Sequence, residues 1–234
     1  MLDLGRTFLQ AVEREPDKLA IIDGARRHTY AEWALHIGAI QQFFNERGLK
    51  RGDRILTVLQ NRYEAATIHW ACQMAGIAIV PLNWRSKPDE IDYCAQNADV
   101  KLAFVEEISL NNYLESETSK SISVILCMEN ASLDGYRYFD QLIHKGAEPE
   151  PRGHVEDISV MLFTSGTTGK PKGVPRKQRA ERAAGIAHVA QNQYAMGEVT
   201  LGVMPLYHTM GVRTLLSLCI VNGTYVAVPR WDVN

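Results

Sequence analysis

The sequence predicts an α/β fold in which parallel sheets are covered by helices on both faces. Two observations support this class. Several short runs are apolar along their whole length, as strands buried on both faces are. Longer segments with helical spacing separate these runs. With 234 residues, of which 46% are hydrophobic, the chain is long enough to form one large domain or two small ones.

The first half of the chain shows the clearest alternation of elements. Thr29 and Glu32 have the spacing of a capping box, which predicts a helix over 31–47 that stops at Gly48. Ser86 and Asp89 repeat this signal before a second helix. The elements predicted after Gly48 are, in order, a strand over 54–60, a helix over 62–75, a strand over 76–82, a helix over 88–98, a strand over 101–105, an exposed helix or loop over 106–120 and a strand over 121–127.

Residues 144–157 are rich in proline, glycine and charge, which makes this segment the best candidate for an internal linker. We therefore expect any break between subdomains near 146–157. The elements predicted after it are a strand over 158–163, a helix over 179–196, a strand over 200–205, a helix over 211–221 and a strand over 224–228.

The composition excludes several classes of protein. The 25 basic and 27 acidic residues nearly cancel, so no overall field favours nucleic acid or an anionic membrane. The N-terminus lacks the apolar core of a signal peptide, and no apolar run is long enough to span a bilayer. We expect a soluble, cytoplasmic protein whose widely spaced cysteines are reduced core residues, namely Cys72, Cys94, Cys127 and Cys219.

A glycine-rich loop carries the strongest chemical signal. It follows an apolar run, and the sequence LFTSGTTGKPKGV covers 162–174. Position 164 is threonine, so the glycine that a Walker A loop requires there is missing. Backbone N–H groups near the glycines, the hydroxyl groups and two lysines could nevertheless hold a polyphosphate. The alternative is a hairpin tip in which these residues only satisfy turn geometry.

The stretch TSGTTGKPKG over 164–173 resembles the phosphate-binding signature of the adenylate-forming (AMP-binding) superfamily, which includes acyl- and aryl-CoA ligases. Residues 29–61 and 74–105 are similar to the opening helix, first core strand and following β-α-β unit of that family. VMPLYHTMGV over 203–212 is similar to its next motif, at the acyl-binding cleft. The resemblance implies that residues 1–234 form the N-terminal part of the family's large domain.

The resemblance also implies a reaction. A carboxylate attacks the α-phosphate of ATP, with Mg²⁺ present, and the thiol of CoA then displaces AMP from the acyl-adenylate. The residues expected to bind the nucleotide are Thr164, Ser165, Gly166, Thr167, Thr168, Gly169, Lys170 and Lys172. His208 is the expected catalytic or gating residue between acid and phosphates, and Tyr207, Met210 and Gly211 are expected to line the acid pocket beside it.

A basic run follows the loop. Arg179 and Arg182 are expected on a solvated helix face, the usual role of such a run. A second hypothesis is that Arg176 or Lys177 helps to attract the phosphates of the nucleotide or of CoA.

Several family motifs are missing from the sequence. It contains no Tyr-Gly-x-Thr-Glu stretch for adenine and Mg²⁺, no Thr-Gly-Asp stretch for the ribose and no C-terminal catalytic lysine. We therefore expect an N-terminal fragment that is inactive alone and that self-associates through exposed apolar surface. The alternatives are an adenylating enzyme that serves a carrier protein, and a non-catalytic nucleotide-binding module.

Overall fold

The computed structural model describes residues 2–128, 133–164 and 170–230, and its α/β architecture confirms the predicted class. The helices are α1 (Leu4–Arg14), α2 (Tyr30–Glu46), α3 (Tyr63–Ala75), α4 (Pro88–Ala98), α5 (Glu107–Glu115), the 3₁₀ helix η1 (Glu117–Lys120), α6 (Phe139–Ile143), α7 (Gln178–Asn192) and α8 (Thr209–Ile220). The strands are β1 (Leu19–Asp23), β2 (Arg26–Thr29), β3 (Arg54–Val58), β4 (Ala78–Leu82), β5 (Leu102–Glu106), β6 (Val124–Cys127), β7 (Arg137–Tyr138), β8 (Ile158–Thr164), β9 (Lys172–Lys177), β10 (Val199–Gly202) and β11 (Thr224–Ala227).

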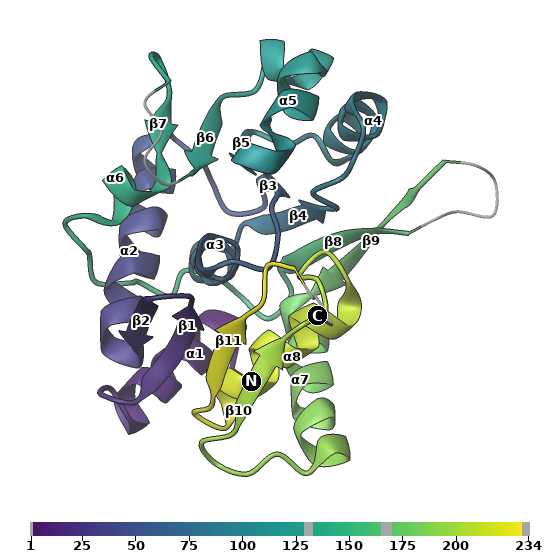
Figure 1. Ribbon diagram of the computed structural model, residues 1–234. Coiled ribbons are helices and arrows are strands. Elements are labelled where there is room, and N and C mark those ends of the chain that lie inside the picture. The colour runs from purple at the N-terminus through teal and green to yellow at the C-terminus, as the bar shows by residue number, and fades with distance from the viewer. Residues whose placement is uncertain (1, 129–132, 165–169, 231–234) are drawn as a thin grey trace.

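The strands of the described ranges form two sheets (Figure 1). The larger has the order β7-β6-β5-β3-β4-β8-β9, and every neighbouring pair is parallel except β8 and β9. The smaller has the order β10-β11-β1-β2, in which β1 pairs parallel to β11 and antiparallel to β2. The short β1–β2 hairpin and strand β9 are elements that the sequence pattern did not predict.

The larger sheet is packed on both faces. Leu102 and Phe104 of β5 belong to a core cluster shared with α1, α2, α3 and α8, whereas Ala103 and Val105 belong to a second cluster shared with α4 and α5. This alternation is the period of two that a strand imposes on its side chains. Strands buried on both faces account for the uninterrupted apolar runs of the sequence.

The smaller sheet has one packed face. Tyr225 of β11 is buried in the first core cluster, and a Cβ on Gly202 of β10 would lie 2.2 Å from its ring. Val199 and Leu201 alternate with these inward positions and are 62% and 49% exposed. Residues Val199 and Leu201 therefore mark an outer face that no described element covers.

Helix α3 lies between the two sheets, where Figure 1 shows it end-on. All thirteen of its residues are buried, including the polar residues Glu64, His69 and Gln73. The helix ends at Gly76, whose φ of 69° is left-handed and suits glycine. Of the described helices, none combines the length and apolar character that crossing a membrane would require.

One of the two predicted capping boxes is confirmed. Thr29 Oγ1 accepts from the N–H of Glu32 at 3.2 Å, and Glu32 Oε2 accepts from the N–H of Thr29 at 2.8 Å. The second prediction is wrong, because the N-cap of α4 is Lys87 and Ser86 Oγ has no partner among the described residues. Pro88 holds the preceding residue in extended conformation, so Lys87 cannot be the first helical residue.

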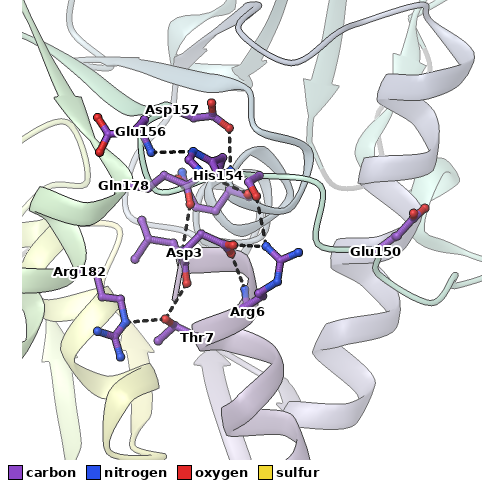
Figure 2. Close-up of polar contacts among 12 residues, drawn as sticks. Asp3, Arg6, Thr7, Glu150, His154, Glu156, Asp157, Gln178 and Arg182 are labelled. Carbon is purple, nitrogen blue, oxygen red and sulfur yellow. Dashed lines mark hydrogen bonds and ion pairs between the residues drawn. The ribbon is translucent and has the colours of Figure 1, made fainter. Parts of the chain in front are cut away.

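The start of α7 is tied to α1, near the first residues of the chain (Figure 2). The buried amide of Gln178 accepts from the N–H of Leu4 at 2.9 Å and donates to the carbonyl of Gln73 at 3.2 Å. The backbone N–H of Gln178 donates to Asp157 O at 2.9 Å. The start of α7, which directly follows β9, is therefore fixed against α1, α3 and the segment before β8. Arg182 also joins α1, because its Nε donates to Thr7 Oγ1 at 2.9 Å.

Candidate active site

Parallel strands of both sheets end at one cleft of about 320 Å³. Ligands of α/β proteins bind where the carboxyl ends of such strands meet. Gln60 Nε2, after β3, donates to Pro229 O, after β11, at 3.2 Å, and so bridges the two sheets beside the cleft. The lining residues are Gln60, Asn61, Trp84, Arg85, Val203, Pro205, Tyr207, Val228, Pro229 and Arg230.

Arg85 gives the cleft positive charge. Its guanidinium carbon lies 3.6 Å from the centroid of the Trp84 ring, a stacked cation–π arrangement that holds the side chain at the cleft. Tyr207 lines the same cleft. Burial raises the pKa of its hydroxyl, and the nearby positive charge of Arg85 opposes that rise. Tyr207 therefore stays protonated at neutral pH and can donate a hydrogen bond into the cleft.

His208 is exposed and caps the N-terminus of α8. Its Nδ1 accepts from the N–H of Met210 at 3.4 Å, so Nε2 is the ring nitrogen that can donate to a ligand. Met210 is exposed beside it, whereas Gly211 is buried. A Cβ on Gly211 would lie 2.1 Å from Pro205 O, so glycine is needed for α8 to pack against the segment before it.

Asn61 holds the segment between β10 and α8 in place by hydrogen bonds. Its role was not predicted from the sequence. Its Nδ2 donates to Gly202 O and to Met204 O, both at 2.7 Å, and its Oδ1 accepts from the N–H of Leu206 at 2.8 Å. The side chain is buried, so these bonds are shielded from water. The sequence did hold one indication of this role, because Asn61 is a polar residue that directly follows the strand predicted over 54–60.

Strands β8 and β9 flank the glycine loop and project from the body of the protein (Figure 1). Ser165, Gly166, Thr167, Thr168 and Gly169 lie outside the described residues. Thr164 and Lys172 are register partners across the two strands and are both exposed. Lys170 Nζ lies 5.4 Å from the ring centroid of Tyr93 on α4.

The lysines of the loop differ from the basic residues that follow. Within the described residues, neither Lys170 nor Lys172 forms an ion pair, so their charges are open to an anionic ligand. Lys177 Nζ and Arg179 Nε instead each lie 2.8 Å from an oxygen of Glu156.

Arg176 also has a carboxylate partner, because its Nε pairs with Glu181. The half-exposed Arg179 agrees with the solvated helix face predicted for it, whereas Arg182 is bonded to α1 instead. The described residues contain no group of three or more His, Cys, Asp or Glu side chains placed to hold a metal ion.

The structure thus places the predicted residues that it describes in two groups, which a hydrogen bond of Arg176 connects. Thr164, Lys170 and Lys172 belong to the β8–β9 hairpin, and Tyr207 lines the cleft between the strand ends. Arg176 joins the groups, since its Nη1 donates to Thr209 Oγ1 at 3.2 Å, next to His208. Trp84 and Arg85 were not predicted, because their place at the cleft depends on how two sheets meet.

An α/β protein with a glycine-rich loop in its sequence and a cleft at its strand ends is typical of nucleotide-binding enzymes. The family described as AMP-binding enzyme matches residues 8–233. The chain belongs to the AMP-binding enzyme family.

Curated relatives match most of this chain but only part of their own length. The chain is 27% identical over 227 residues to 4-hydroxybutyrate–CoA ligase 2 of Metallosphaera sedula, covering 92% of this chain and 41% of that protein. It is 29% identical to the mitochondrial malonate–CoA ligase ACSF3 of Mus musculus, covering 93% of this chain and 38% of the relative. The chain thus spans about two fifths of the length of these two ligases.

Solved structures share the fold along nearly the whole chain. The inhibitor-bound N-terminal domain of FACL13 from Mycobacterium tuberculosis superimposes with a TM-score of 0.88 at 19% identity, covering 99% of this chain and 58% of that one. ATP-bound MatB from Rhodopseudomonas palustris gives a TM-score of 0.83 at 23% identity, covering 99% of this chain and 46% of the other. These matches confirm the predicted architecture.

Proposed function

We propose that residues 1–234 form the N-terminal part of the large domain of an ATP-dependent, AMP-forming carboxylic acid:CoA ligase. The observation that carries this proposal is the family match over 8–233, in a chain that has two lysines without ion pairs among the described residues at its glycine loop and a cleft at the strand ends. The relatives with CoA ligase names favour CoA over a carrier protein as the thiol acceptor.

Charge repulsion is the main obstacle to the reaction, because an anionic carboxylate must approach a polyanion. The proposed role of Ser165, Thr167, Thr168 and Lys170 is to hold the β- and γ-phosphates, with Thr164 at the strand end nearest the nucleotide. Lys172 adds a second positive charge. Several charge-assisted hydrogen bonds of about 1.5–3 kcal/mol each would be enough to bind the phosphates.

The acid is proposed to lie near His208 and Tyr207, with Met210 and Gly211 at the pocket wall. Nε2 of His208 and the hydroxyl of Tyr207 can donate hydrogen bonds to a carboxylate there. CoA is the proposed second substrate. Mg²⁺ is not assigned to side chains of this chain, because no carboxylate cluster suited to a metal lies among the described residues.

The proposal is tested by pyrophosphate release. A longer protein that contains this chain should release pyrophosphate from ATP and Mg²⁺ only when an acid of the correct class is added, and should form a thioester only with CoA. The 234-residue chain alone is expected to bind ATP weakly and to release none. If the longer protein releases no pyrophosphate with any of a panel of aliphatic and aromatic acids while the chain binds nucleotide, a binding module is the better interpretation.

A matched pair of lysine variants tests the site on this chain. Lys172→Ala is expected to weaken ATP binding about tenfold, since it removes an unpaired charge beside the loop. Lys177→Ala is the control, because Lys177 is paired with Glu156. Binding is measured by titration calorimetry at two salt concentrations, and only Lys172→Ala should reduce the salt dependence. An equal effect of both variants would contradict the assigned loop.

A further inference from the structure

Arg176 lies where three elements meet. It belongs to β9, the strand that leaves the glycine loop, and its side chain is about one-fifth exposed. Its Nε forms an ion pair with Glu181 in the first turn of α7. Its Nη1 donates to Thr209 Oγ1 at 3.2 Å, at the first residue of α8. One guanidinium therefore links the hairpin, α7 and the residue that follows His208.

Glu181 makes this contact rigid. Its side chain is fully buried, and burial raises the pKa of its carboxyl while the charges of Arg176 and Arg213 lower it. Arg213 lies one turn into α8, so Glu181 faces cations from both β9 and α8. A buried carboxylate is costly unless it is paired, and removing one partner of such a pair destabilises a protein strongly. Arg176 is thus held in one position by its buried partner.

The surroundings of Arg176 do not suit a direct phosphate ligand. Its Nε faces a carboxylate and its Nη1 a hydroxyl, so its charge is already neutralised. The loop lysines Lys170 and Lys172, in contrast, have no ion-pair partner among the described residues. Arg176 differs from them in connecting elements rather than presenting an open charge.

We propose that Arg176, which is anchored by the buried Glu181, is a positioning residue. It ties strand β9 to the first turn of α8 and so sets the place of His208 relative to Lys172. This inference rests on the proposed function, in which the loop holds the phosphates and His208 lies near the acid. Binding of polyphosphate at the loop should then be felt at His208 through Arg176 and Thr209.

The test follows both ends of the link by NMR of the 234-residue chain during titration with ATP. In the unmodified chain, signals of Lys172 and of the His208 ring should both shift. Thr209→Val removes the hydroxyl acceptor at nearly constant volume. The double variant Arg176→Met/Glu181→Leu removes both members of the ion pair, so the buried Glu181 carboxylate is not left without Arg176. In both variants the lysine shifts should persist and the His208 response should fall by more than half.

Arg179→Met is the matched control, because Arg179 lies three residues beyond Arg176 and pairs with Glu156 at the surface. It should leave the His208 response unchanged. Arg176→Lys should retain more of that response than the double variant does. Lysine keeps the positive charge but cannot donate to Glu181 and Thr209 with the planar geometry of a guanidinium. If ATP binds and His208 responds equally in all variants, the inference is overturned while the proposed function stands.

Amide hydrogen exchange, measured without ligand, tests the inference even if ATP does not bind. A failure of ATP to bind would count against the proposed function but not against this inference. Thr209→Val, although it lies on α8, should speed exchange in β9 on the order of tenfold. Arg179→Met should not change exchange in the first turn of α8. Unchanged exchange of β9 in Thr209→Val would show that the link carries no coupling.

Discussion

At the scale of single residues, His69 shows how burial sets a charge state. The ring is almost fully buried in α3, and its Nε2 has no hydrogen-bond partner among the described residues. Burial lowers its pKa from 6.5 to about 4. His36 behaves similarly, because burial and then the charge of His28 lower its pKa to about 4. Both rings are therefore neutral in the folded protein at neutral pH.

This predicts a stability that declines in weak acid. A histidine whose pKa is lower in the folded than in the unfolded state must lose a proton on folding once the pH falls below 6.5. Its contribution to the free energy of unfolding is complete above pH 6.5 and is lost as the pH falls from 6.5 towards 4. The free energy of unfolding in urea should drop over this window, and His69→Leu should reduce the drop by roughly 3 kcal/mol. His144→Leu, at an exposed position, is the control. An unchanged drop in His69→Leu would contradict the assignment.

At the scale of elements, the two helix starts that look alike in the sequence differ in structure. Thr29 caps α2, whereas Ser86 lies one residue before the N-cap of α4. Thr29→Ala should lower the free energy of unfolding by about 1 kcal/mol. Ser86→Ala should have little effect or stabilise slightly, because it removes a buried hydroxyl that has no partner in the described part of the chain. Urea unfolding compares the two variants, and equal losses would show that Ser86 does cap α4.

The elements that the sequence predicted are those in which local pattern and burial agree. The strands over 54–60 and 76–82 and the helix over 62–75 are apolar because they are buried, so the structure confirms them. Strand β9 was missed because its sequence KGVPRK is polar and contains Pro175. Proline is tolerated there because β9 is an edge strand. Its pairing with β8, not its own pattern, makes it a strand.

The candidate site was predicted in part for the same reason. Lys170 and His208 stand in contiguous motifs, so the sequence alone marks them. Asn61 and Arg85 reach the cleft through the meeting of β3, β4 and the segment after β10, which no local pattern records. Arg176 lies on β9 and Glu181 on α7, so no periodic pattern of one element relates them. Their ion pair forms because α7 begins directly after β9.

At the scale of the whole molecule, the outer face of the smaller sheet is apolar and exposed at its β10 edge. Val199 and Leu201 lie on its edge strand β10, and the exposed Met196, Val203 and Met204 adjoin it. An edge strand without charged or proline residues has free backbone groups that favour pairing with another strand. We propose that this face mediates self-association of the chain.

Sedimentation velocity over a range of concentrations tests this proposal. Leu201→Lys should weaken association about tenfold, because it places a charge on the apolar face. Leu35→Lys, on α2, is the control, since Leu35 is 38% exposed but lies away from β10. Association that Leu201→Lys leaves unaltered, or a chain that stays monomeric at every concentration, would exclude this face.

The pairing of β1 with β11 has a consequence for synthesis of the protein. Ile21 is the register partner of Tyr225, so β1 completes its sheet with a strand that is made about 200 residues later. At about 5–20 residues per second the ribosome needs roughly 10–40 s to cover that distance. During this interval the β1–β2 hairpin has no partner strand on its other side. The nascent β1–β2 hairpin therefore needs protection from aggregation until β11 has been made.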